Sequence, residues 1–161
     1  MEVYLIRHGI AAERGTYADD DARPLVAKGR EKTTQIAKRL VKMGVKFEFI
    51  LTSPLVRAQE TANILLTEGL SDTLAEFPPL APSGDITLWL DWCQQHKPAK
   101  IALVGHEPDL SNWTEILVWG EIKEQIILKK AGIIGIEIPN IDEQVIGNCQ
   151  LFLLTSPKWF L

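Results

Sequence analysis

The order of strand-like and helix-like segments most constrains what this chain can fold into. Apolar runs alternate with stretches of helical periodicity, and two consecutive strand-like runs close the chain. The expected strands cover residues 3–7, 47–52, 100–105, 131–139 and 148–156, and the expected helices cover 28–44, 53–69, 84–96 and 108–120. This alternation favours an α/β fold, a three-layer α/β/α sandwich around a mostly parallel sheet. The last two strands, joined by a polar turn around residues 140–143, predict an antiparallel C-terminal hairpin.

Local signals set the expected ends of the helices. Gly44 and Gly69 follow the first two helical stretches, where a glycine can adopt the left-handed conformation that ends a helix. Ser53 is the expected N-cap of the second helix, with Pro54 at its first position. A proline-rich loop is expected between the second and third helices.

Composition excludes several classes of function. With 161 residues, the chain is expected to form one domain over residues 1–161. The net charge of -4 comes with no basic stripe, so nucleic acid is not an expected partner. No signal peptide or membrane-length apolar segment is present, which favours a cytoplasmic protein without a membrane partner. Cys93 and Cys149 lie far apart without histidines at ligand spacing, so neither zinc nor a disulfide framework is expected.

Cationic and imidazole side chains gather where the expected parallel strands end. Arg7, His8 and Gly9 close the first strand, Arg57 follows the second within one helical turn, and His106 follows the third. The carboxyl ends of parallel strands share one edge of a sheet, which is where such folds bind ligands. We therefore expect these side chains to converge.

The chemistry of this set favours a phosphoryl group as the ligand. Two guanidiniums match a phosphate dianion through paired hydrogen bonds. A neutral imidazole at His8 can attack phosphorus, and a protonated one at His106 can bind a phosphoryl oxygen. Arg57 lies beside a helix N-terminus, where a cation is unfavourable unless an anion lies between them. Gly9 would keep a side chain away from the bound oxyanion and allow a sharp turn.

Three segments in this order resemble the histidine phosphatase superfamily, which has the phosphoglycerate-mutase-like fold. "LIRHG" at 5–9 resembles its defining motif, "SPLVRAQETA" at 53–62 the element with its second arginine, and "LVGHEP" at 103–108 the element with its second histidine. The short chain, "ARPLVAKG" at 22–29 and "LAPSGD" at 80–85 most resemble its SixA-type phosphohistidine phosphatases.

The resemblance implies a metal-independent phosphatase without a cofactor. It makes His8 the nucleophile, transiently phosphorylated, and implies that phosphate is the product. The partner would be a protein carrying phosphohistidine, such as a phosphotransfer domain or phosphocarrier protein in signalling. The residues that would bind the phosphoryl group are Arg7, Gly9, Arg57 and His106, with Arg23 as a weaker candidate whose alternative is a solvated loop arginine.

The chain departs from the wider superfamily at the general acid. Phosphomonoesterases and mutases of this fold usually carry a glutamate before the third helix, but Pro82 lies near that position. None of the nearby acids Glu76, Asp85 and Glu107 matches it clearly, and Asp85 fits a helix N-terminus better. A histidine leaving group is only weakly basic and has less need of a strong acid. The hypothesis is that the chain prefers a P–N bond to an alkyl phosphate.

Two alternative functions stay open at this stage. A small-molecule phosphomonoesterase or mutase on the same fold would need a carboxylate on the leaving-group side. A noncatalytic module that binds phosphoprotein would not need a nucleophile, which makes the pair of histidines harder to explain. A nucleotide-binding protein is disfavoured because the chain has neither a GxGxxG turn nor a P-loop.

Overall fold

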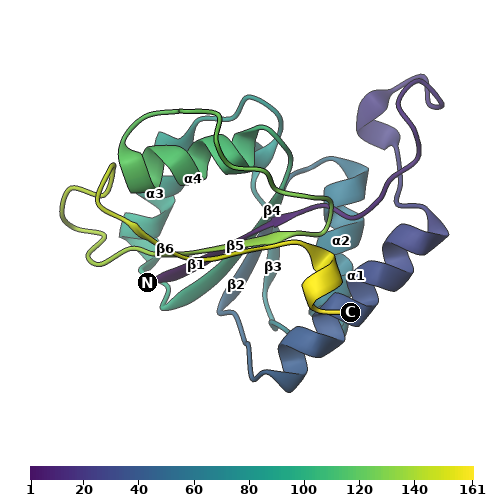
Figure 1. Cartoon of the computed structure of the whole chain (residues 1–161), viewed down its shortest axis with the longest axis horizontal. Helices are drawn as coiled ribbons and strands as arrows, with labels where there is room; N and C mark the ends of the chain where they lie inside the picture. The colour runs from purple at the N-terminus through teal and green to yellow at the C-terminus, as the bar shows by residue number, and fades with distance from the viewer.

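A six-stranded sheet forms the centre of the computed structural model, which describes residues 1–161 (Figure 1). The strands are β1 (Glu2–Arg7), β2 (Phe49–Thr52), β3 (Leu74–Glu76), β4 (Lys100–Gly105), β5 (Ile133–Glu137) and β6 (Gln150–Thr155). The helices are α1 (Ala27–Lys42), α2 (Val56–Thr67), α3 (Ile86–His96) and α4 (Asp109–Trp119). Three short 3-10 helices are η1 (Asp20–Ala22), η2 (Pro78–Leu80) and η3 (Pro157–Trp159).

The strand order across the sheet is β3-β2-β4-β1-β5-β6. The pairs among β3, β2, β4 and β1 are parallel, whereas β5 runs antiparallel to both β1 and β6. The predicted α/β class, with a mostly parallel sheet and an antiparallel C-terminal pair, is therefore confirmed. Because β1 and β4 are neighbours in register, Arg7 lies opposite Gly105, and the segments that follow both strands leave the sheet side by side.

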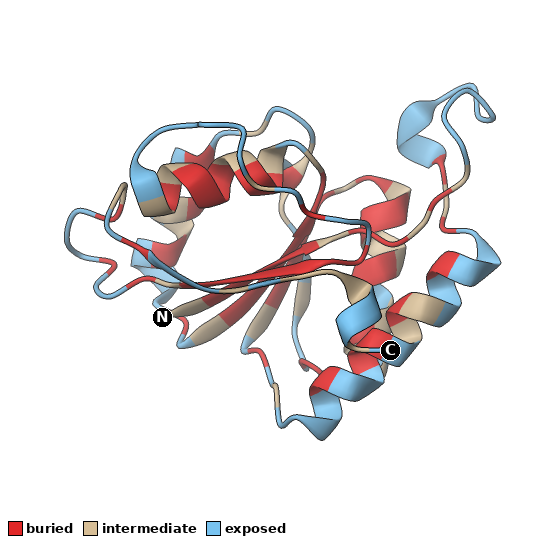
Figure 2. Ribbon diagram, viewed as in Figure 1, coloured by how far each residue is buried: buried red, intermediate tan, exposed pale blue.

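Helices cover both faces of the sheet and make two apolar cores. Alternate residues of β1 point to opposite faces, so Leu5 packs with the core under α3 and α4, and Ile6 packs with the core under α1 and α2. The buried residues run along the sheet and the inner faces of these helices (Figure 2). The four central strands are apolar on both sides for this reason. None of the helices has the length and apolar character needed to cross a membrane.

Two local expectations were wrong. Ser53 does not cap α2: the helix begins at Val56, and the Ser53 hydroxyl accepts a hydrogen bond from Leu55 N–H ahead of it. The proline-rich loop contains β3, a three-residue edge strand beside β2. By contrast, Gly44 and Gly69 both have the expected positive φ, at 78° and 97°.

The C-terminal strands are joined by a longer connection than a tight polar turn. β5 ends at Glu137 and β6 begins at Gln150. Ile141 and Val145 of this connection are buried in the core under α3 and α4. Their burial explains why a stretch that reads as a polar turn is held against the domain.

Candidate active site

His8 leaves the end of β1 with one defined tautomer. Its Nδ1 lies 2.7 Å from the carbonyl oxygen of Gly9, and its backbone N–H donates to the carbonyl of Gly105 at the end of β4. A carbonyl oxygen can only accept, so Nδ1 carries the proton. The neutral ring therefore has its lone pair on Nε2, the nitrogen that is free for chemistry.

His106 faces His8 from the end of β4. The two ring centroids are 5.2 Å apart. His106 Nε2 lies 2.7 Å from Ser53 Oγ, a hydroxyl at the end of β2, and its Nδ1 is buried without a hydrogen-bond partner. Three neighbouring strand ends therefore contribute to one arrangement, as the shared edge of a parallel sheet requires.

Both imidazoles are neutral at physiological pH. Burial lowers the pKa of His8 to about 3, and the cations of Arg57 and Arg7 act in the same direction. Burial also lowers the pKa of His106 to about 4, and the same two arginines contribute. A phosphate dianion near these cations would reverse the sign of the local field and favour protonation of His106.

Arg57 lies buried in the first turn of α2, and an acid is beside it. Its Nη1 donates to the Asp20 carbonyl at 3.0 Å, and its Nη2 lies 3.4 Å from the Asp20 carboxylate. Arg23 is also buried; it donates from Nε to the same carboxylate at 2.7 Å and from Nη1 to the carbonyl of Ala12. Arg23 is thus not a solvated loop arginine, and Asp20 is the anion that the two guanidiniums share.

Arg7 is held by the loop that precedes β5. Its Nη1 donates to the Leu128 carbonyl at 2.9 Å, and its Nε is buried without a partner. Glu115, fully buried on α4, organises the same loop by accepting from the backbone N–H groups of residues 123–126. Burial alone would raise the pKa of Glu115, but these four hydrogen bonds hold it below its ordinary value.

The need for glycine at position 9 comes from helix packing. A Cβ on Gly9 would lie 2.6 Å from Thr33 Oγ1 on α1, and Gly9 does not have a positive φ. Its N–H donates to Thr61 Oγ1 on α2, which in turn donates to the Arg57 carbonyl. The need for glycine here is therefore steric and not a left-handed backbone conformation, and the Gly9 amide ties β1 to α2.

The three acids near the site have different environments. Asp85 caps α3: its carboxylate accepts from Thr87 N–H and Oγ1, which lowers its pKa. Glu76 is exposed at the end of β3 and accepts from Gln59. Glu107 is half-buried next to His106, burial raises its pKa, and its Oε1 has no partner. Only Glu107 has the environment of a carboxyl group that could hold a proton.

Several residues of this arrangement were not identified from the sequence. Ser53 bridges to His106, Thr61 fixes Gly9, Asp20 joins two arginines, and Glu115 shapes the loop beside Arg7. Only Asp20 had a local signal, because it precedes Arg23 by three residues within an acidic run. No group of three or more histidine, cysteine, aspartate or glutamate side chains is arranged to hold a metal ion.

Taken together, a parallel sheet edge with two facing imidazoles and buried arginines defines a class of phosphoryl-handling enzymes. Residues 3–76 match the model of the histidine phosphatase superfamily, branch 1. The structure of the protein histidine phosphatase SixA complexed with tungstate superimposes over all of both chains, with a TM-score of 0.86 and 25% identity. The chain belongs to the histidine phosphatase superfamily, and is a phosphatase of that fold.

Two sequence relatives match this chain over most of its length. An uncharacterized protein of Picosynechococcus sp. is 46% identical over 100% of this chain and 99% of its own length. Phosphohistidine phosphatase SixA of Escherichia coli K12 is 29% identical over 67% of this chain and 68% of its own. The similarity therefore extends well beyond the three short motifs.

Proposed function

We propose that the chain is a metal-independent protein phosphohistidine phosphatase that works through a phospho-His8 intermediate. Arg7, Arg57 and His106 bind the phosphoryl oxygens, and Arg23 supports Arg57 from the loop. Gly9 contributes by holding the His8 tautomer through its carbonyl rather than by its amide, which is engaged by Thr61. The similarity to proteins named for phosphohistidine supports this substrate class.

One observation carries the proposal: His8 is buried, neutral and protonated at Nδ1. Its Nε2 lone pair attacks phosphorus in line while the P–N bond to the substrate imidazole breaks. The substrate ring carries a proton on its other nitrogen before attack, so it takes the P–N electron pair and leaves as neutral histidine, while His8 keeps its Nδ1 proton and becomes a phosphorylated imidazolium. Water then attacks phospho-His8, releasing inorganic phosphate and restoring the neutral ring. Arg7 and Arg57 stabilise charge on the equatorial oxygens, which is the main source of catalysis in phosphoryl transfer.

The environment of the acids supports a P–N substrate. Asp85 is engaged as a helix cap, and the segment before α3 carries Pro82 where an acid is usual. An alkoxide needs strong protonation as it leaves, whereas a phosphohistidine ring that is protonated on its other nitrogen leaves as neutral imidazole, a weak base whose conjugate acid has a pKa near 6.5. In this proposal the substrate histidine is on a protein, such as a phosphotransfer domain or phosphocarrier. The reaction belongs to cytoplasmic signalling, and residues 1–161 act as one domain.

Glu107 favours a second candidate, a small-molecule phosphomonoesterase. The Glu107 carboxyl group is half-buried, its pKa is raised, and its Oε1 has no hydrogen-bond partner. Glu107 directly follows His106 in the sequence. Such a group can donate a proton to an alkoxide. If it does so, a phosphate ester becomes the better substrate, and Glu107→Gln lowers ester hydrolysis while leaving P–N hydrolysis unchanged.

The test is a substrate competition in EDTA. Wild type, His8→Ala and His96→Ala receive a phosphotransfer domain phosphorylated on histidine, phosphoramidate and several sugar or glycerate phosphates. His96 is exposed on α3 away from the site, so it is a matched histidine control. We expect turnover of the P–N substrates by wild type and His96→Ala, and its loss in His8→Ala with an unchanged circular dichroism spectrum.

Other outcomes are equally informative. Higher kcat/KM for a phosphate ester, together with sensitivity to Glu107→Gln, would select the phosphomonoesterase. Turnover that survives in His8→Ala would exclude the covalent intermediate. Binding of phosphoprotein without turnover of any substrate would leave the noncatalytic module. Activity that is lost in EDTA and restored by magnesium would contradict metal independence.

A further inference from the structure

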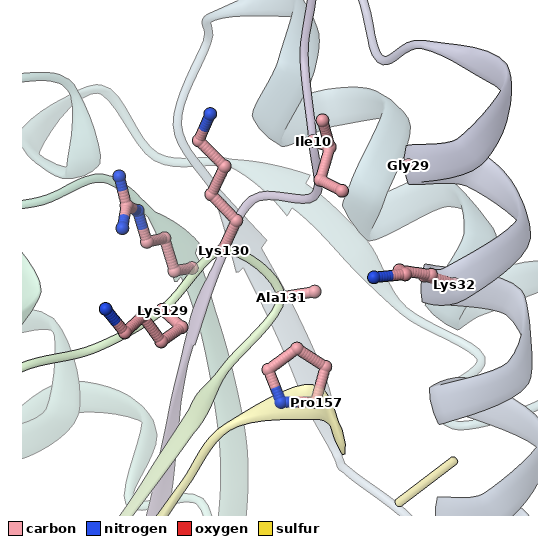
Figure 3. A pocket seen from close by; sticks show the side chains of 8 residues that line it. Ile10, Gly29, Lys32, Lys129, Lys130, Ala131 and Pro157 are labelled. Carbon is pink, nitrogen blue, oxygen red and sulfur yellow. The ribbon is translucent and has the colours of Figure 1, made fainter.

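A cavity of about 340 Å³ with cationic walls adjoins the candidate active site (Figure 3). It lies between α1 and the segment that precedes β5. Four of the residues that line it are cations: Arg7, Lys32, Lys129 and Lys130. No acidic residue lines it, although the chain as a whole carries a net charge of -4. The positive charge is therefore concentrated locally against the overall sign of the protein.

The three lysines have no ionic partners within the protein. Lys46, Lys97 and Lys100 each pair with a carboxylate elsewhere on the surface, but Lys32, Lys129 and Lys130 pair with none. Lys129 and Lys130 are exposed, and Figure 3 shows Lys32 reaching toward the gap from α1. Like charges around one cavity repel one another unless an anion lies between them. The cavity is therefore suited to a negatively charged ligand.

The backbone fixes this cavity relative to His8. Ala131, the residue after Lys130, donates its N–H to the carbonyls of both Arg7 and His8 at 3.1 Å. α1 forms the other wall of the cavity. A Cβ at Gly29 would lie 2.1 Å from the Ile10 carbonyl oxygen, so α1 packs in direct contact with the segment after Gly9. The lysines are thus carried by backbone that packs against the proposed nucleophile.

We propose that the lysine cavity docks an acidic stretch of the phosphoprotein whose phosphohistidine enters the site. This inference rests on the proposed function. Arg7 lines the cavity and is also a proposed ligand of the phosphoryl group. One molecule can therefore place an anion in the cavity and its phosphoryl group at His8. Lys129 and Lys130 present hydrated charges to solvent, as expected at the rim of a protein interface. A second anionic group of a small molecule shares this chemistry, and the substrates below separate the two sources.

The test compares Lys129→Ala/Lys130→Ala with Lys38→Ala/Lys42→Ala. The second pair also removes two exposed cations, but on the far part of α1. For the phosphorylated phosphotransfer domain at low salt, we expect the KM of the first variant to rise about 10-fold with kcat unchanged. For phosphoramidate, which has no acidic stretch, kcat/KM should stay within about twofold. High salt should bring wild type close to the variant.

A binding measurement keeps the inference separate from the proposed function. A fluorescein-labelled peptide of eight glutamates should bind wild type and the control variant, with at least about fivefold weaker binding to Lys129→Ala/Lys130→Ala. Inactivity of wild type on both P–N substrates with retained peptide binding would remove the proposed function and leave the docking surface.

Four outcomes would overturn the docking inference. Equal losses on the phosphoprotein and phosphoramidate would mean that the lysines serve the phosphoryl group itself. A selective loss on 2,3-bisphosphoglycerate would assign the cavity to a small molecule. Equal effects in both double variants would indicate net charge alone, and unchanged kinetics and peptide binding in the first variant would exclude the surface altogether.

Discussion

Two loops hold the two arginines of the candidate site, and they do so in opposite ways. The loop around η1 reaches Arg57 through Asp20, whose backbone carbonyl accepts from Arg57 Nη1 at 3.0 Å and whose exposed carboxylate lies 3.4 Å from Arg57 Nη2. This loop extends from the end of β1 past α2 (Figure 1). The loop before β5 reaches Arg7 through the Leu128 carbonyl and is ordered from inside by the fully buried Glu115.

We call the loop before β5, which holds Arg7, the fixed arm of the site, and the loop around η1, which holds Arg57, the displaceable arm. A buried carboxylate with four backbone partners cannot be removed without leaving donors unsatisfied. An exposed carboxylate that pairs with arginines exchanges readily with another anion, because solvent can replace its contacts. We infer that Arg7 is preorganised, whereas Arg57 exchanges the Asp20 carboxylate for phosphate when the substrate binds.

The largest effect is expected at the fixed arm. Glu115→Ala removes the buried acceptor of four backbone N–H groups and should lower the free energy of unfolding by about 3 kcal/mol or more. Urea denaturation measures this directly. The loop that holds Arg7 should also loosen, so kcat/KM for phosphoramidate should fall more than the fraction of unfolded protein explains.

Glu121→Ala is the matched control for that variant. Glu121 is an exposed glutamate on the same loop and pairs only with Lys123, at 3.5 Å. Its loss should change the free energy of unfolding by less than about 0.5 kcal/mol. Similar effects of the two substitutions would mean that Glu115 does not order the loop.

Features that follow from the order of elements could be predicted from the sequence, whereas features that depend on tertiary contacts could not. Strand–helix alternation was sufficient for the layers and the sheet, because each apolar run must be covered on both faces. β3 could not be predicted, since three residues are too few to show a period and pairing with β2 decides their conformation. The start of α2 was misplaced because the Ser53 hydroxyl contacts His106, a residue 53 positions away.

The site divides in the same way. His8 and His106 follow strands, and parallel strands end at one edge, so their approach follows from the order of elements alone. Asp20 and Glu115 act through long connections whose paths depend on tertiary contacts, and the sequence pattern does not specify these paths. The close approach of Thr33, on α1, excludes a side chain at Gly9, and this contact depends on tertiary packing that the sequence pattern does not specify.

An intermediate effect is expected from pH, because both arms act on His106. Burial, together with the cations of Arg57 and Arg7, lowers the pKa of His106 to about 4, and the Asp20 carboxylate opposes this shift. A bound tungstate dianion would raise this pKa, so binding takes up a proton between the free-state and bound-state pKa values. Within that window, tungstate affinity should increase about 10-fold for each unit by which pH falls.

Calorimetry in buffers of different ionisation enthalpy measures this proton uptake. His106→Asn keeps a polar side chain that does not titrate, and its tungstate affinity should show a flatter pH profile over the window in which wild type takes up the proton. A profile as steep as that of wild type would assign the proton to another group. Affinity that increases with pH would contradict the sign of the argument.

The smallest effect is expected at the displaceable arm. Asp20→Asn removes the carboxylate that competes for Arg57 and Arg23, so tungstate should bind about two- to fivefold more tightly. Asp21→Asn is the matched control, because Asp21 is exposed on the same 3-10 helix and makes no ion pair. Weaker binding by Asp20→Asn alone would mean that Asp20 positions the two guanidiniums for the anion instead of competing with it. The η1 loop would then be preorganised like the loop ordered by Glu115, and the contrast between the two arms would not hold.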